Sequence, residues 1–149
     1  MLITGGLDRD ERRLSSSELW APGPNSISCQ VNASMSLKRY MHSSYDGVAC
    51  GGWGGNDSMT SCDRLDTRTG EWSRSHTLKQ RRYNHVMWRK SSGDIIIMGG
   101  YYNETRTTTE VLKDDGSSDF SFNLTHDTRY VDLLTCVCND QHWIMIIFY

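Results

Sequence analysis

The sequence lacks the features that would place it in several large classes of protein. Its 149 residues carry a formal net charge of −2, without the basic stripe that a nucleic-acid-binding surface needs. It contains no run of about eighteen apolar residues, so no membrane-spanning helix is predicted. No signal peptide is recognisable at the first residues, which read as a strand that runs into a turn.

Catalytic and cofactor motifs are missing as well. There is no nucleophile elbow, P-loop, metal-ligating helix or dinucleotide-binding glycine run. The glycine-rich stretch at 51–55 is not followed by a helix start that could cradle a phosphate. We therefore predict no catalytic residue and no cofactor, and we expect the protein not to be an enzyme.

Cysteine usage excludes two further classes. The count of five is odd and fits neither a dense disulfide scaffold nor a zinc ribbon. Cys136 and Cys138 lie near His142, but a structural zinc ion wants four ligands and no fourth is near. No metal site is predicted.

What the sequence does contain is an internal repeat. Glycine pairs recur with spacings of 46 and 48 residues, and Arg-Tyr pairs recur with spacings of 43 and 47. Three markers that keep one order and nearly one period indicate a repeat architecture. The markers are Gly5, Gly6, Gly51, Gly52, Gly99 and Gly100 for the glycine pairs, Arg39, Arg82 and Arg129 for the Arg-Tyr pairs, and His42 and His85 after the first two tyrosines.

The segments between the markers read as short strands. Blocks of apolar and β-branched residues alternate with turn signals such as Asp46-Gly47 and Asp115-Gly116, and no helical stripe is sustained. The segments 86–88 and 95–98 are predicted to form a hairpin. The unbroken apolar run at 95–98 indicates a strand that is covered on both faces.

The repeat resembles the kelch repeat, the unit of one type of β-propeller. In the middle unit Arg39, His42, the glycine pair at 51–52 and Trp72 hold the kelch positions, whereas Leu65 stands where the pattern usually has tyrosine. In the next unit Leu112 replaces that tyrosine, and Phe120 takes the place of the tryptophan.

The resemblance implies an all-β, kelch-type β-propeller fragment with four-stranded antiparallel blades. The expected units are a partial blade at 1–38, blades at 39–81 and 82–128, and a partial blade at 129–149. Because a closed ring of this type has about five to seven blades, the remaining blades are expected in a longer chain or in a second copy.

The same resemblance gives the marker residues structural roles. The paired glycines are expected where the second strand leaves the sheet, and Trp72 is expected to anchor neighbouring blades. Arg39 and Arg82 are expected to hydrogen-bond the loops of the adjoining blade. His42 and His85 are interpreted as packed scaffold.

The loops that follow the glycine pairs are the candidate binding sites. Kelch proteins often recognise partners with the loops on one face of the ring, and exposed Trp, Tyr and Arg are typical of interface hot spots. The alternative is that these aromatic side chains pack back against the next blade. The candidate residues are Trp53, Asn56, Asp57, Tyr101, Tyr102, Asn103 and Arg106.

Two further signals bear on the compartment. Four sites fit Asn-x-Ser/Thr, which is more than chance predicts, and they make Asn32, Asn56, Asn103 and Asn123 candidate glycosylation sites. Cys50 and Cys62 flank the second glycine-rich loop and would lie at paired strand ends, where a disulfide is plausible. Both signals favour an extracellular or secreted protein over a cytoplasmic one.

Three functions follow as hypotheses. The first is a non-catalytic binding module that recognises a protein or a glycan. The alternatives are a cytosolic kelch-like substrate adaptor of a ubiquitin ligase, which would require a BTB domain, and part of a kelch-fold carbohydrate oxidase, which would require copper.

Overall fold

The structure is a computed structural model. It describes the backbone of residues 2–22, 27–102, 104–105, 107–123, 131–138 and 141–148, and the side chains of residues 2–20, 33–102 and 107–119. Among the described residues every regular element is a strand, and no helix is long and apolar enough to cross a membrane.

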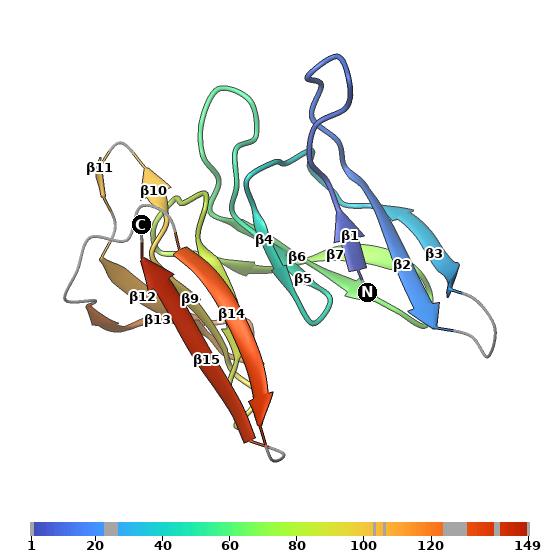
Figure 1. The fold of residues 1–149 in the computed structure, drawn as a ribbon. Coiled ribbons are helices and arrows are strands. Elements are labelled where there is room, and N and C mark those ends of the chain that lie inside the picture. Colours follow the sequence, from blue (N-terminus) through green and yellow to red (C-terminus); the bar gives the residue numbers. More distant parts are fainter. Residues whose placement is uncertain are drawn as a thin grey trace.

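The strands form a series of antiparallel sheets that follow one another along the chain (Figure 1). Two sheets have four strands each, in the orders β4-β5-β6-β7 and β13-β12-β9-β8. A three-stranded sheet, β1-β2-β3, precedes them, and the pairs β10-β11 and β14-β15 complete the set. The strands are β1 (Leu2–Thr4), β2 (Ser16–Pro22), β3 (Ile27–Ser34), β4 (Ser43–Tyr45), β5 (Val48–Cys50), β6 (Ser61–Asp66), β7 (Glu71–Thr77), β8 (Val86–Arg89), β9 (Ile95–Met98), β10 (Tyr101–Tyr102), β11 (Glu104–Thr105), β12 (Thr108–Leu112), β13 (Ser118–Asn123), β14 (Val131–Cys138) and β15 (Gln141–Phe148).

The predicted all-β architecture is therefore confirmed. The expected hairpin is formed by β8 and β9, with Val86 opposite Met98 and Arg89 opposite Ile95. All four residues of β9 are buried, as the apolar run predicted. A central strand that is apolar on both faces needs a covering layer on each side, and the sheet β4-β5-β6-β7 supplies one of them, against Ile95 and Ile97.

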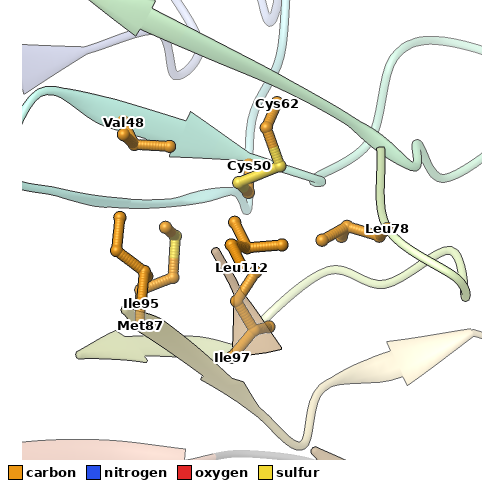
Figure 2. Close-up of a cluster of buried hydrophobic side chains, with 8 residues drawn as sticks. All are labelled: Val48, Cys50, Cys62, Leu78, Met87, Ile95, Ile97 and Leu112. Carbon is orange, nitrogen blue, oxygen red and sulfur yellow. A yellow bond between two sulfur atoms is a disulfide. The ribbon is translucent and has the colours of Figure 1, made fainter. Parts of the chain in front are cut away.

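The main core lies between the two four-stranded sheets (Figure 2). Val48 and the Cys50–Cys62 disulfide come from the first sheet, and Leu78 comes from the connection that follows it. The second sheet contributes Met87, Ile95, Ile97 and Leu112. Because each sheet buries one face on the next, the two sheets are held as one packed unit.

The glycine pairs lie where the second strand of each sheet ends, and their backbone requires glycine. Gly51 and Gly52 both have positive φ, at 59° and 87°. A Cβ on Gly51 would lie 2.6 Å from the carbonyl oxygen of Arg82, and one on Gly52 would lie 2.7 Å from Cβ of His42. Close approach of another backbone, as well as the left-handed conformation, therefore excludes any larger residue.

The same pairs link each sheet to the next through the backbone. Gly6 N donates to the carbonyl oxygen of Arg39, and Gly52 N donates to that of Arg82, both over 2.9 Å. Trp72 also joins two sheets, because its indole Nε1 donates to Ser17 Oγ at 2.7 Å. The inter-blade anchor expected of Trp72 is thus present.

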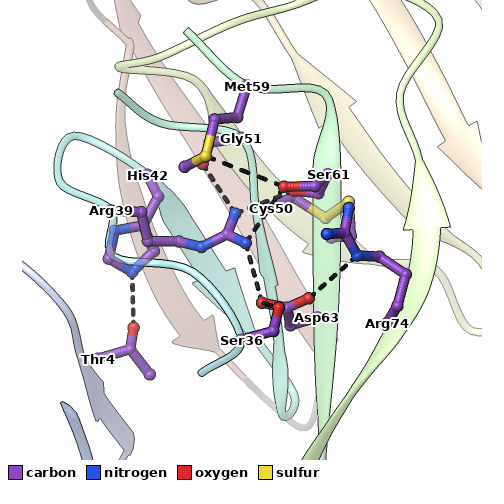
Figure 3. Close-up of polar contacts among 11 residues, drawn as sticks. Thr4, Ser36, Arg39, His42, Cys50, Gly51, Met59, Ser61, Asp63 and Arg74 are labelled. Atoms are coloured by element: carbon purple, nitrogen blue, oxygen red, sulfur yellow. Dashed lines mark hydrogen bonds and ion pairs between the residues drawn. A yellow bond between two sulfur atoms is a disulfide. The ribbon is translucent and has the colours of Figure 1, made fainter. Parts of the chain in front are cut away.

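The arginine side chains make a different set of contacts from those expected. The backbones of Arg39 and Arg82 hydrogen-bond the loop of the adjoining sheet, whereas their guanidinium groups donate to groups of their own sheet. Arg39 donates to the carbonyl oxygens of Gly51 and Ser61, each at 2.9 Å, and to Asp63 Oδ2 at 3.0 Å (Figure 3). The expected hydrogen bonds to the loop of the adjoining sheet are therefore made by the backbone of each arginine, whereas its side chain turns back across the end of its own sheet.

Arg82 repeats this arrangement one unit later. It donates to the carbonyl oxygens of Gly99 at 2.6 Å and Thr108 at 3.2 Å, and to Glu110 Oε1 at 2.7 Å. Both members of the Arg82–Glu110 ion pair are 0% exposed, as are both members of Arg39–Asp63. Each pair is a buried clamp that closes one end of its sheet.

Candidate functional site

The loops that follow the glycine pairs project from the same side of the molecule (Figure 1). The loop between β5 and β6 begins with Trp53, whose backbone pairs with Tyr40 through a donation of 2.8 Å from Trp53 N to Tyr40 O. Tyr101, after the next glycine pair, is held in the same way by Tyr83, with 2.8 Å from Tyr101 N to Tyr83 O. We call the side of the molecule formed by these loops the loop face.

Aromatic side chains on the loop face touch one another across the two sheets. The ring of Trp53 meets that of Tyr83 edge to face, with centroids 5.5 Å apart, and Tyr83 meets Tyr101 at 5.3 Å. The indole Nε1 of Trp53 also donates to the carbonyl oxygen of Gly55 at 2.6 Å. These contacts fix the rings against the next sheet, but all three side chains remain half-buried and present part of their surface to solvent.

An open depression lies in the β5–β6 loop, which also carries Trp53. Its volume is about 340 Å³. Arg81 lies at its wall and donates to Asp57 Oδ2 at 2.7 Å and to the carbonyl oxygen of Ser58 at 3.0 Å. The lining residues are Gly54, Asn56, Asp57, Ser58, Met59, Thr60, Ser61 and Arg81.

The polar groups of the depression suit recognition by hydrogen bonding. The hydroxyl of Ser58 is buried, and it has no hydrogen-bond partner within the described part of the chain. The Asp57–Arg81 pair is half-exposed on both sides, so its charges remain accessible to a ligand. A polar wall next to half-buried aromatic rings is a combination that binds proteins and carbohydrates.

The structure places the predicted binding residues on this face only in part. It brings Trp53, Asn56 and Asp57 into one loop and holds Tyr101 and Tyr102 in β10, after the next glycine pair. Asn103 and Arg106 lie outside the described residues. The side chains of Asn32 and Asn123 lie outside the described part as well, whereas Asn56 is exposed at the rim of the depression.

Sequence reasoning missed two members of this site. Nothing in the sequence singles out Arg81, and Ser58 has a signal only as the third residue of the glycosylation motif at Asn56. Their proximity depends on how the loop folds back, since Gly54 N donates to Asp57 O at 3.0 Å. The repeat pattern does not predict this proximity, because Arg81 and Ser58 are not among the repeated marker residues.

The cysteine prediction is confirmed, because Cys50 and Cys62 form a disulfide with Cα atoms 4.1 Å apart. The two residues are directly opposite in the β5–β6 pairing. For Cys29, Cys136, Cys138 and His142 the side chains lie outside the described part, as does the whole of Arg129. Within the described side chains, no group of three or more His, Cys, Asp or Glu could hold a metal ion.

The two marker histidines are packed into the scaffold. His42 accepts or donates a 2.7 Å hydrogen bond through Nε2 to Thr4 Oγ1 on β1, and burial together with Arg39 lowers the pKa of His42 to about 4. His85 is buried, and burial followed by the charge of Arg82 lowers its pKa well below the usual value. Both imidazoles are therefore neutral near neutral pH.

We expect the free energy of unfolding to fall on mild acidification because of these histidines. An unfolded histidine titrates near pH 6.5, so between that pH and the folded pKa the unfolded state takes up protons that the folded state does not. For His42 the expected loss between about pH 7.5 and about pH 5.5 is about 1.3 kcal/mol, and His85 adds to it.

Urea unfolding of the wild type and of His42→Gln at the two pH values checks this expectation. The glutamine variant is expected to lose about 1 kcal/mol less than the wild type over the same interval. Equal pH dependence in the two proteins would show that His42 does not titrate as the structure requires.

Comparison with known proteins agrees with this geometry. Residues 48–75 match the Kelch motif. Among solved structures, the chain is similar to that of YjhT, with a TM-score of 0.72 at 12% sequence identity over 95% of this chain and 56% of that one. It is also similar to a fungal alcohol oxidase of the AA5 family in complex with copper, with a TM-score of 0.58 at 16% identity over 80% of this chain and 30% of the oxidase.

These likenesses establish the fold and leave activity open. The chain spans 56% of YjhT and 30% of the oxidase, and no curated protein matches it in sequence. At these identities, the chemistry of neither protein is carried over to this one.

Proposed function

Because the chain is a segment of a kelch-type β-propeller, we propose that it serves as a non-catalytic binding module that recognises a protein or a glycan through the loop face. The observation that carries the proposal is the row of half-buried rings, Trp53, Tyr83 and Tyr101, beside the polar depression. Rings that are already fixed lose little conformational entropy on binding, and aromatic side chains of this kind dominate interface energetics.

The competing functions have less support. The likeness to a copper-containing oxidase rests on the fold alone. The substrate-adaptor alternative rests on the kelch motif alone.

Replacement of Trp53 tests the proposal. The purified chain is applied to printed arrays of oligosaccharides and of secreted proteins, and the dissociation constant of any hit is measured for the wild type and for Trp53→Ala. Loss of a hot-spot aromatic costs at least about 2 kcal/mol, so binding is expected to weaken by about 30-fold.

Two variants make that result interpretable. Tyr45→Ala removes a tyrosine that is 40% exposed at the end of β4, away from the loop face, and is expected to leave binding unchanged. Arg81→Ala removes a half-exposed wall of the depression without touching the aromatic packing. If Trp53→Ala and Arg81→Ala bind as the wild type does, or if Tyr45→Ala alone weakens binding, the loop face is not the binding site.

We also propose that the protein works in an extracellular or secretory setting. The Cys50–Cys62 disulfide supports this, since such bonds persist in oxidising compartments, and exposed Asn56 in its glycosylation motif is consistent with it. Two free thiols at these positions in the natural protein would contradict the proposal.

A further inference from the structure

The β5–β6 loop contains a tight hairpin whose tip presents the side chain of Asn56. Gly54 N donates to the carbonyl oxygen of Asp57 at 3.0 Å, so the two residues Gly55 and Asn56 connect the paired ends. Gly55 has a φ of 143°, a conformation that favours glycine, and it has no side chain. The side chain of Asn56 is therefore the one that the tip offers to solvent, and Asn56 is exposed.

Asn56 is also the first residue of an Asn-Asp-Ser motif, the pattern of an N-linked glycosylation acceptor. Such acceptors are used where they lie in surface loops of proteins that pass through a secretory compartment. An exposed hairpin tip meets that condition, and the Cys50–Cys62 disulfide fits an oxidising compartment of this kind. Local geometry and sequence motif therefore agree at this asparagine.

The serine of the motif supplies a second, independent observation. Ser58 is 1% exposed, and its hydroxyl has no hydrogen-bond partner within the described part of the chain. A buried hydroxyl without a partner destabilises a folded protein, so alanine would suit this position at least as well. The glycosylation motif requires a hydroxyl residue here. Transfer of a glycan to Asn56 before the loop folds explains why the hydroxyl is present.

Asn56 lies at the rim of the depression on the loop face. The neighbouring Asp57 accepts a 2.7 Å hydrogen bond from Arg81 Nη1, and both residues line the same depression. A glycan bonded to Asn56 therefore begins beside the charged pair in the wall. Because N-linked glycans are bulky, one at this rim lies over the opening and restricts access to both charges.

The sequence carries the same motif in the next hairpin of the loop face. Tyr102 pairs with Glu104 in the β10–β11 hairpin, and Asn103 stands between them in the sequence, followed by Glu104 and Thr105. The loop after the first glycine pair, residues 7–13, contains no asparagine. The acceptor motif thus recurs in two of the loops that carry the aromatic row.

We propose that Asn56 carries an N-linked glycan that covers the depression and closes this part of the loop face to a protein partner. The inference rests on the proposed function, because it concerns access to the same face. Molecules in which Asn56 is unmodified keep the depression and the Asp57–Arg81 pair open. The fraction of chains that carry the glycan then sets how much of the protein is able to bind.

The modification is a transfer of an oligosaccharide from a lipid diphosphate donor. Nδ2 of Asn56 forms a bond to the anomeric carbon of the oligosaccharide, and the bond from that carbon to the diphosphate oxygen breaks. The lipid diphosphate leaves with the electron pair of that bond, and Nδ2 gives up one proton. No electron is gained or lost overall, so the step needs no oxidant or reductant.

Glycopeptide mass spectrometry of the whole chain, secreted from cultured animal cells behind a cleavable leader, tests for the modification. We expect a glycan on the peptide that contains Asn56, and we expect it to be absent from the Asn56→Gln and Ser58→Ala variants. Ser58→Ala removes a hydroxyl that makes no hydrogen bond in the described structure, so the variant is expected to fold. An unmodified Asn56 in the secreted wild type would overturn the proposal.

Modification of arginine by phenylglyoxal tests whether the glycan covers the depression, and it needs no binding partner. Arg81 is expected to react at least about threefold more slowly in the glycosylated wild type than in Asn56→Gln or Ser58→Ala, because the glycan shields it. Arg68 serves as the internal reference, since its side chain is 84% exposed in the turn at the other end of β6. Equal reactivity of Arg81 in all three proteins would show that the glycan leaves the depression open.

A matched variant separates this glycan from glycosylation in general. Asn32→Gln removes the acceptor motif in β3, outside the loop face, and is expected to leave Arg81 as protected as in the wild type. If Asn32→Gln exposes Arg81 as much as Asn56→Gln does, the protection does not come from Asn56.

Binding measurements distinguish this inference from the proposed function. A protein that binds the Asn56→Gln chain is expected to bind the glycosylated wild type at least about tenfold more weakly. Equal dissociation constants would overturn the closure while the binding function stands. If Trp53→Ala binds as its parent does, the binding function fails, whereas the glycan and the protection of Arg81 are judged by their own measurements.

Discussion

Replacing Arg82 with methionine is expected to lower the free energy of unfolding by about 3–5 kcal/mol, because it leaves the carboxylate of Glu110 buried without its cation. The methionine keeps much of the apolar length of the side chain, so the loss reports the missing charge and hydrogen bonds. Arg82 also holds the carbonyl oxygens of Gly99 and Thr108 together at the end of the sheet. Urea unfolding, followed by tryptophan fluorescence, measures the effect.

The neighbouring arginine provides a matched control. Arg81 forms an ion pair with Asp57 in which both partners are half-exposed, so Arg81→Met is expected to cost no more than about 1 kcal/mol. If Arg82→Met is no more destabilising than Arg81→Met, the clamp does not contribute to stability as its burial indicates.

Glu110 extends the effect of this clamp beyond its own sheet. Its carboxylate also accepts the backbone N–H groups of Lys79, at 2.6 Å, and Gln80, at 3.1 Å, in the connection that arrives from the preceding sheet. The Glu110 carboxylate therefore holds both the side chain of Arg82 and the backbone segment through which the chain enters the blade. Glu110→Gln keeps one acceptor oxygen and is expected to be less destabilising than Arg82→Met.

The second large effect is expected from the Cys50–Cys62 disulfide. Reduction, or the double change Cys50→Ala and Cys62→Ala, is expected to lower the free energy of unfolding by about 2–4 kcal/mol. The bond closes a loop with a sequence separation of 12 residues, which restricts the unfolded chain. The alanine variant also leaves space in the core between the two sheets, so it is expected to be less stable than the reduced wild type.

Unfolding of the oxidised, reduced and double-alanine proteins in parallel separates the two contributions. Alkylation of free thiols before mass analysis establishes which state each sample is in. Equal stability of oxidised and reduced protein would mean that the loop between β5 and β6 is already restricted in the unfolded chain.

The repeat explains how much of the fold could be predicted. Gly51 and Gly52 combine a positive φ with a close approach of neighbouring atoms that leaves no room for a Cβ, so their recurrence marks the strand ends directly. The hairpin from β8 to β9 was predictable because its apolar run and its turn are local in sequence. The disulfide was predictable because two cysteines flank one loop between strands that pair with each other.

The contacts of the arginines could not be predicted in the same way. Arg39 lies in the segment that connects two sheets along the chain. The spacing of the repeat alone allows its side chain to turn toward either sheet. Its partner, Asp63, recurs as Glu110 and Glu18 at the same place in the other sheets, so an acidic signal was present. The repeat pattern alone does not predict that this acidic residue and the marker arginine form an ion pair.

The site was less predictable than the fold for a related reason. Trp53 and Asp57 were identified because of their residue types and their place after a glycine pair. Arg81 joins them from the far end of the blade, across 24 residues of sequence, through an ion pair that no repeated position encodes. Loop contacts of this kind depend on the individual loop.

The backbone link between successive sheets bears on how such a chain can change length during evolution. Gly6 binds the carbonyl oxygen of Arg39, and Gly52 binds that of Arg82, with the same geometry. If the segment 39–81 were deleted in frame, Gly6 would meet Arg82, which carries the same backbone group and its own acidic partner. Gain or loss of one whole unit therefore preserves this backbone junction, whereas an insertion of a few residues within a unit shifts the strand register. Genes for such chains are expected to grow and shrink by whole repeats.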